Sequence, residues 1–255
     1  LHGTDYDVAV SARVPYEGAP FMLCVHGKGI ADILRSTGAD AVELQGLDNH
    51  WIQIKTGNAQ FRIAGLDPTD YPEQAGAKAA AGFEVPCRTV SDLIAAVAHA
   101  QSNDETRPSL NGALWEVQPE KGEIRLTLVA TDGHRLSKVS FLGGAAHKGL
   151  KPAKVIVHKK SMTTLARALD AATVETATFS VVDRHIYVTI GDVTIRALLI
   201  DETYPDYTKV IPKSGKVTLH LRRAEILAAL KSAATMTTSK TQIVKIVVDD
   251  LGLTI

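Results

Sequence analysis

The densest group of chemically reactive side chains lies at residues 131–136, Thr-Asp-Gly-His-Arg-Leu. His134 could act as a general base that Asp132 orients. Residues two apart on a strand share a face, but no Ser or Cys nucleophile is identifiable beside this pair. The chain has no HExxH, CxxC, GxSxG, phosphate-loop or dinucleotide-binding pattern. The sequence therefore predicts a protein that is not an enzyme and has no catalytic, metal or cofactor site; an enzyme centred on His134 is the less favoured alternative.

The same segment has a structural interpretation. Asp132-Gly133 is a tight-turn signal between apolar runs at 126–130 and 136–141, since glycine adopts the positive φ that such turns require. We expect a hairpin there, with His134 and Arg135 at its mouth. Two further pairs of alternating runs, 51–55 with 59–63 and 185–190 with 193–199, meet at Gly57 and Gly191 and predict two more hairpins.

Helical spacing of apolar residues appears in four short segments, each preceded by a short apolar strand at 21–25, 83–85, 155–157 or 217–221. We expect these apolar stripes to pack on the sheets. The order is a strand, a helix and then several strands, which predicts an α+β fold with helices on one face of antiparallel sheets. The stripes are Ile30, Ile33 and Leu34; Val90, Leu93, Ile94 and Val97; Met162, Leu165, Ala166 and Leu169; and Ile226, Leu227 and Leu230.

The chain repeats itself. The segment DLIAAV that begins at 92 returns as EILAAL at 225, 133 residues later, and the Tyr-Pro pair at 71 returns at 204, also 133 residues later. A shared long period indicates one domain type used several times. We expect linkers at 73–82 and 212–215, and domains at 1–80 (the C-terminal part only), 81–213 (complete) and 214–255 (the N-terminal part only).

Composition is neutral overall, with 28 basic and 28 acidic residues, which argues against a strong electrostatic grip on nucleic acid by the whole surface. Cys24 and Cys87 lie outside any metal spacing and are typical of reduced thiols in the cytosol. The helix faces opposite the apolar stripes are small and partly basic. They are either ordinary solvated faces or a lining that neutralises phosphates without reading bases.

The segments Ala-Thr-Asp-Gly-His-Arg-Leu at 130–136, Leu-Asn-Gly at 110–112 and Tyr-Pro-Asp-Tyr-Thr-Lys-Val-Ile-Pro at 204–212 together closely resemble the bacterial DNA polymerase sliding clamp family, the β subunit of the replicative DNA polymerase III holoenzyme. The resemblance covers the whole chain. It implies the DNA clamp fold: repeated domains whose antiparallel sheets lie outside and whose short helices line the inner face. It also implies a homodimer ring in the bacterial cytoplasm that encircles duplex DNA during replication.

The resemblance implies three sets of residues. The first binds short peptides of polymerases, the clamp loader and repair proteins: Leu110, Thr131, Gly133, His134, Arg135, Leu136, Pro205, Lys209 and Val210. The second contacts duplex DNA without sequence preference: Lys28, Arg35, Arg88, Arg107, Lys159, Lys160, Arg167, Arg222, Arg223 and Lys231. The third forms the dimer interface: Phe61 and Ile63 on a sheet-edge strand, and Thr235 and Met236 at a helix end of the partner.

The sequence departs from the family at Lys209, where the family often has Arg, and at 107–109, where it often has aromatics. The chain also lacks the rest of the family's first and third domains, so we expect a fragment that is incompetent to close the full ring. The leading hypothesis is a processivity factor that encircles DNA. The alternative is a β-rich scaffold that binds peptides without DNA.

Overall fold

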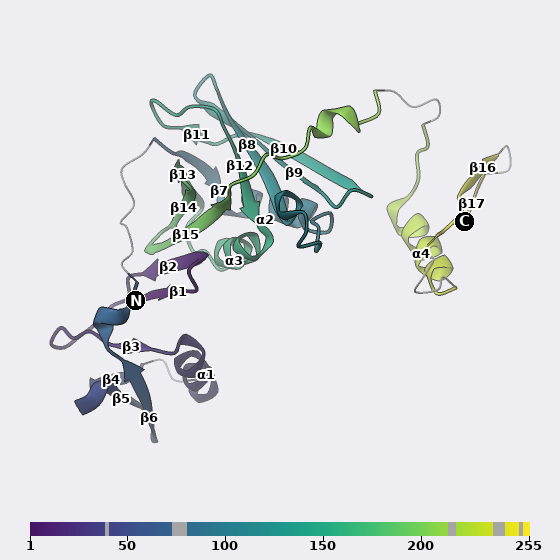
Figure 1. The fold of residues 1–255 in the computed structure, drawn as a ribbon. Coiled ribbons are helices and arrows are strands. Elements are labelled where there is room, and N and C mark those ends of the chain that lie inside the picture. Colours follow the sequence, from purple (N-terminus) through teal and green to yellow (C-terminus); the bar gives the residue numbers. More distant parts are fainter. Residues whose placement is uncertain (39–40, 73–80, 214–217, 237–242, 250–251) are drawn as a thin grey trace. The chain divides into compact units, whose positions relative to one another are not determined.

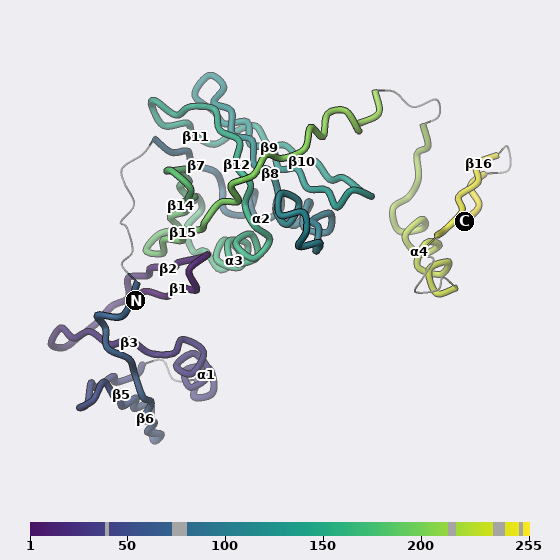
Figure 2. Tube along the Cα trace, viewed as in Figure 1, coloured from purple at the N-terminus to yellow at the C-terminus, as the bar shows by residue number. Residues whose placement is uncertain are grey.

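The computed structural model describes residues 1–38, 41–72, 81–213, 218–236, 243–249 and 252–255. The chain divides into two compact units, Leu1–Pro205 and Asp206–Ile255 (Figures 1 and 2). Residues 73–80 of the first predicted linker and 214–215 of the second lie outside the described residues. The predicted domain boundaries at 80/81 and 213/214 therefore stay predictions.

The first unit is built on an eleven-stranded antiparallel sheet in the order β10-β9-β8-β12-β15-β14-β13-β7-β11, with β2 also paired to β15 and β1 to β2 (Figure 1). Its strands are β1 (His2–Thr4), β2 (Val8–Ala12), β7 (Phe83–Pro86), β8 (Gly112–Glu120), β9 (Glu123–Thr131), β10 (Leu136–Gly143), β11 (Ala145–Ala146), β12 (Ala153–His158), β13 (Thr176–Val182), β14 (His185–Ile190) and β15 (Val193–Ile200).

The long strand β15 joins parts of the chain that are far apart in sequence. Its first residues pair with β14 on one edge and with β2 on the other, with Ile195 opposite both Val188 and Val10. Its last residues pair with β12. The predicted hairpin between β14 and β15 is confirmed, and Gly191 in its turn has a φ of 55°, which favours glycine.

A second, four-stranded sheet in the same unit has the order β3-β6-β5-β4: β3 (Cys24–Val25), β4 (Glu43–Gly46), β5 (Trp51–Thr56) and β6 (Ala59–Leu66). The β5–β6 hairpin is the one predicted at Gly57, whose φ is 54°. The strand predicted at 21–25 is shorter than expected, because only its last two residues pair, with Leu66 and Gly65 of β6.

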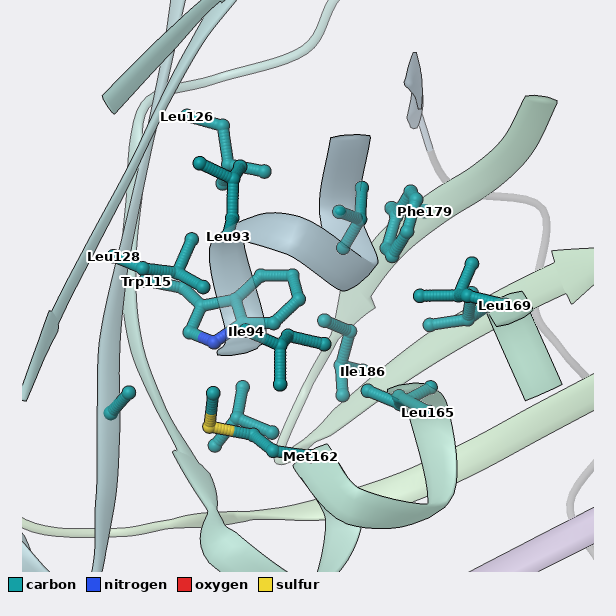
Figure 3. Close-up of a cluster of buried hydrophobic side chains, with 14 of the residues drawn as sticks. Leu93, Ile94, Trp115, Leu126, Leu128, Met162, Leu165, Leu169, Phe179 and Ile186 are labelled. Carbon is teal, nitrogen blue, oxygen red and sulfur yellow. The ribbon is translucent and has the colours of Figure 1, made fainter. Parts of the chain in front are cut away.

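Two helices cover the large sheet, α2 (Cys87–Ala98) and α3 (Lys159–Asp170). Their predicted apolar stripes are confirmed: of these residues only Ala166 is half-buried, and the others are buried in one cluster with Trp115 and Phe179 (Figure 3). The rings of Phe83 and Phe179 stack in this cluster with their centroids 5.3 Å apart. Full burial of one such side chain contributes roughly 1.5–3 kcal/mol. Because the apolar stripes of α2 and α3 are buried in this core, the opposite faces of these two helices point away from it.

The other two α-helices of the described residues, α1 (Gly27–Thr37) and α4 (Arg223–Ala234), contain no buried residue. The expectation that their stripes pack on sheets is met only in part: Ile30, Ile33, Ile226 and Leu230 are half-buried, whereas Leu34 and Leu227 are each 38% exposed. Helix α1 lies against strand β6. Of the strand predicted at 217–221, the described residues 218–221 are not in a strand, while the second unit's strands are β16 (Val247–Asp249) and β17 (Gly252–Thr254).

Of the helices in the described parts of the chain, none combines the length and the apolar composition that a membrane span requires.

Candidate functional site

The β9–β10 connection is a tight, internally hydrogen-bonded turn, as predicted. The Asp132 carboxylate accepts hydrogen bonds from the backbone N–H groups of His134 (2.9 Å) and Arg135 (3.0 Å). The Thr131 hydroxyl accepts from the Gly133 N–H and donates to the Arg135 carbonyl. Gly133 has a φ of 92°, a conformation that side-chain-bearing residues rarely adopt. His134 and Arg135 are exposed at the mouth of the hairpin.

The two backbone N–H groups, followed by the Arg135 guanidinium at 2.9 Å, lower the pKa of Asp132 to about 2 against the opposing effect of partial burial. The Asp132 carboxylate is thus ionised, and its partners are groups of the turn itself. Among the described residues it forms no hydrogen bond with the His134 ring, so the geometry does not resemble an oriented general base.

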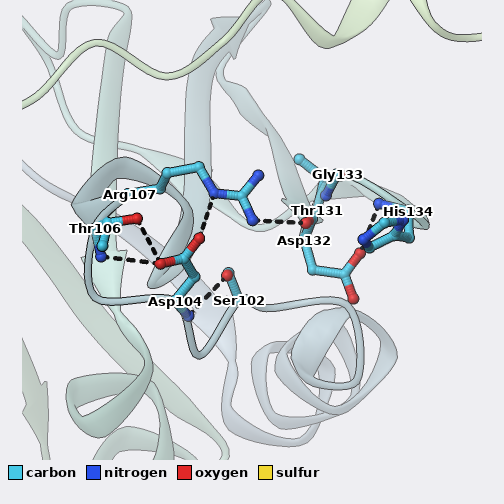
Figure 4. Close-up of polar contacts among 8 residues, drawn as sticks. All are labelled: Ser102, Asp104, Thr106, Arg107, Thr131, Asp132, Gly133 and His134. Carbon is cyan, nitrogen blue, oxygen red and sulfur yellow. Dashed lines mark hydrogen bonds and ion pairs between the residues drawn. The ribbon is translucent and has the colours of Figure 1, made fainter. Parts of the chain in front are cut away.

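Arg107 lies across this turn (Figure 4). Its Nε donates to Asp104 Oδ2 at 2.8 Å, and its Nη2 donates to the backbone carbonyl of Asp132 at 3.4 Å. Its Nη1 would lie 3.1 Å from a Cβ added at Gly133. Asp104 is itself held by Thr106, whose N–H and hydroxyl both donate to Oδ1. The structure therefore places Arg107 beside the predicted peptide residues, although the sequence grouped it with the DNA-contacting cations.

The other predicted peptide residues of the first unit lie near this turn. Leu110 is buried in the turn (Pro108–Leu110) that follows Arg107, and its N–H donates to the Arg107 carbonyl. Leu136, half-buried, pairs with Thr131 across the first position of the hairpin. Tyr204 was not predicted. Burial raises the pKa of Tyr204 to about 12, while the nearby Thr131 backbone has a smaller, opposite effect. This proximity to Thr131 places Tyr204 against the same hairpin.

Pro205, Lys209 and Val210 complete the predicted set. Pro205 is exposed and ends the first unit. Lys209 and Val210 belong to the second unit, where Val210 is 68% exposed and the Lys209 ammonium lies 3.5 Å from Asp206. Within one compact unit the structure thus places Leu110 and the predicted peptide residues at 131–136 close to one another, and it adds Arg107, which was not predicted for this site.

Six of the ten predicted DNA-contacting side chains already have a polar partner within the chain. The pairs are Arg35 with Asp32, Arg88 with Asp92 and Asp170, Arg107 with Asp104, Lys159 with Asn103, Lys160 with Asp5 and Asp7, and Arg222 with Glu225. For the other four, Lys28, Arg167, Arg223 and Lys231, no ion pair occurs within the described residues. Five of these six side chains pair with carboxylates, which offset their charge, whereas Asn103 beside Lys159 is neutral.

Comparisons with known proteins assign the family. A family model described as "DNA polymerase III beta subunit, central domain" matches residues 84–206, and one described as "DNA polymerase III beta subunit, N-terminal domain" matches residues 1–75. The chain belongs to the bacterial DNA polymerase III beta sliding clamp family. The two matches cover both sheets of the first unit and the turn that holds Asp132.

Individual sliding clamps agree with this assignment. The chain is 29% identical to the beta sliding clamp of Escherichia coli strain K12 over 259 residues, and 26% identical to that of Bacillus subtilis strain 168 over 245 residues. The alignment with the Escherichia coli clamp covers 100% of this chain and 68% of that protein. The alignment with the Bacillus subtilis clamp covers 91% of this chain and 62% of that protein.

Solved sliding clamps share the fold, as predicted. The clamp of Pseudomonas aeruginosa superposes with a TM-score of 0.79 at 27% identity, covering 95% of this chain and 64% of the other. The clamp of Bartonella birtlesii, solved with bound griselimycin, superposes with a TM-score of 0.82 at 25% identity, covering 100% of this chain and 71% of the other.

The predicted dimer-interface residues of this clamp chain lie on exposed elements. Phe61 and Ile63 are half-buried on β6, which pairs with β5 over residues 59–64 and with β3 at its last two residues. Residues 59–64 therefore leave one strand edge open within the described structure. Thr235 ends α4, and Met236 beyond it is 87% exposed.

In the described parts of the chain, no group of three or more His, Cys, Asp or Glu side chains could hold a metal ion. Cys87 is buried and Cys24 half-buried, and both are free thiols. Burial raises the pKa of Cys87, which keeps it protonated at neutral pH.

Proposed function

We propose that the protein to which this chain belongs is a DNA polymerase processivity factor: a sliding clamp that encircles duplex DNA and has no catalytic activity of its own. The observation that carries the proposal is the match of residues 1–75 and 84–206 to consecutive domains of the polymerase III beta subunit, in a chain whose fold superposes on solved clamps. We further propose a closed homodimer in the bacterial cytoplasm, with the predicted domains 1–80, 81–213 and 214–255.

The charge arrangement supports a loose hold on DNA. A protein held by phosphate contacts alone binds more weakly as salt rises, roughly as the 0.9 power of salt concentration for each neutralised phosphate. Five of the ten predicted cations form ion pairs within the chain, so each of them must exchange a carboxylate for a phosphate to contact DNA. Retention would then come from enclosure, which allows movement along the duplex.

The turn that joins β9 to β10 supports the second part of the proposal, docking of linear peptides from polymerases, the clamp loader and repair proteins. It combines an apolar base, Leu110 and Leu136, with the fixed polar groups of the 131–135 turn and the Arg107 guanidinium. An extended peptide with a few apolar anchors needs such a combination. Lys209 and Val210 stay predictions of the family resemblance.

The decisive experiment compares two DNA substrates. The full-length protein, loaded by its clamp loader onto a nicked circular plasmid, is separated from free protein by gel filtration before and after the plasmid is cut once. A ring stays on the circle and runs off the linear form. Equal retention on both forms, or none on the circle, would favour the alternative of a β-rich peptide-binding scaffold without DNA encirclement.

A further inference from the structure

The N-terminal hairpin of β1 and β2 lies beside α3 (Figure 1), and Lys160 at the start of α3 forms ion pairs with it. The Nζ of Lys160 lies 2.8 Å from Oδ2 of Asp5 and 3.2 Å from Oδ2 of Asp7. Both carboxylates come from the turn between β1 and β2, and Asp7 is 153 residues away from Lys160 in sequence. The hydrogen bonds to Asp5 and Asp7 raise the pKa of Lys160, so the group is fully charged and shared between two acids.

The cluster lies on the outward face of α3. Met162 and Leu165 on the opposite side are buried in the core, while Thr163 and Arg167 are exposed. The side chain of Lys160 is 46% exposed, and those of Asp5 and Asp7 are 50% and 61% exposed. Ion pairs this exposed contribute at most about 1 kcal/mol, so another anion can displace either carboxylate.

We propose that Asp5 and Asp7 determine the strength of the DNA contact: they hold Lys160 in an internal ion pair that a DNA phosphate must displace. The inference rests on the function proposed above. Exchange of a carboxylate for a phosphate leaves the number of charge pairs unchanged, so the contact adds little net affinity. Arg167, two turns along the same face, forms no ion pair within the described residues and provides the internal comparison.

The test is the double variant Asp5→Asn/Asp7→Asn of the full-length protein. Asparagine keeps the oxygen that accepts the Val8 N–H at 3.0 Å, so the turn is preserved. Binding of a fluorescent 30-base-pair duplex is followed by anisotropy between 50 and 200 mM NaCl. The freed Lys160 adds about one phosphate contact, which steepens the slope of log K against log salt by about 0.9. The ratio of the variant's binding constant to that of the wild type then grows about 3.5-fold as salt falls from 200 to 50 mM.

Two controls separate this mechanism from a general gain of positive charge. Glu123→Gln/Glu202→Gln changes the net charge equally, and neither side chain forms an ion pair in the described structure. Lys160→Met is combined with the Asp5 and Asp7 changes. An unchanged slope, an equal gain in the glutamate control, or a gain that persists with Lys160→Met would each overturn the inference.

Two further readouts complete the design. If the double asparagine variant unfolds, single variants decide: Lys160→Met should weaken binding less than Arg167→Met, and an equal or larger loss contradicts the proposal. Failure of the proposed function is recognised separately, because it shows in the wild type as loss of selective retention on circular DNA. That assay does not depend on Asp5 or Asp7.

Discussion

Gly133→Ala is the most informative change in the candidate peptide site. Gly133 has a φ of 92°, and a Cβ there would lie 3.1 Å from Nη1 of Arg107. The substitution therefore has two effects: it strains the backbone of the 131–135 turn, and it pushes the Arg107 guanidinium from its place over the Asp132 carbonyl. Both effects act on the turn that forms the candidate peptide site.

The size of the effect follows from the conformation. A side-chain-bearing residue held at such a φ costs about 1–3 kcal/mol. If the free turn relaxes to avoid this strain and must be restored for binding, peptide affinity falls by the same free energy. With 1.4 kcal/mol per tenfold change, the expected loss is roughly 5- to 150-fold.

Gly149→Ala is the matched control. Gly149, in the loop between β11 and β12, has a φ of 87°, and an added Cβ would meet nothing within 4 Å. Both variants should lose similar thermal stability, whereas only Gly133→Ala should lose affinity for a synthetic peptide from a partner polymerase in isothermal titration calorimetry. Wild-type affinity for Gly133→Ala, or an equal loss for Gly149→Ala, would refute the reasoning about the 131–135 turn.

Three other predictions follow from the same structure. Phe179→Ala should lower the free energy of unfolding by about 3–5 kcal/mol, measured by urea denaturation, because it empties a fully buried site; a loss below 1 kcal/mol contradicts that packing. The pKa of Asp132 is depressed to about 2, so the turn should hold above pH 4 and loosen as pH falls toward 2, seen as a shift of the His134 amide in NMR spectra that Asp132→Asn lacks. Met236→Asp, but not Thr235→Ala, should weaken dimerisation of the full-length protein in size-exclusion chromatography; a dimer unaffected by Met236→Asp rejects that anchor.

Local patterns in the sequence determined most of the secondary structure. Alternating residues on each side of Gly57 and Gly191, and the turn signal at Asp132-Gly133, correctly predicted three hairpins, because side-chain alternation and turn chemistry act over a few neighbouring residues. The stripes of α2 and α3 were predicted for the same reason. The resemblance across segments 110–112, 130–136 and 204–212 also predicted the family that the domain matches show.

The surroundings of those elements depended on tertiary structure. An apolar stripe shows that a helix face favours burial but does not specify what covers it, so the same pattern is buried in α2 and partly exposed in α1. The pairing of β2 with β15 and the contact of Lys160 with Asp5 join residues that no local pattern connects. The number of charged residues could be counted from the sequence. Which of them neutralise one another depends on the distances between their charged groups, and only the folded chain sets those distances.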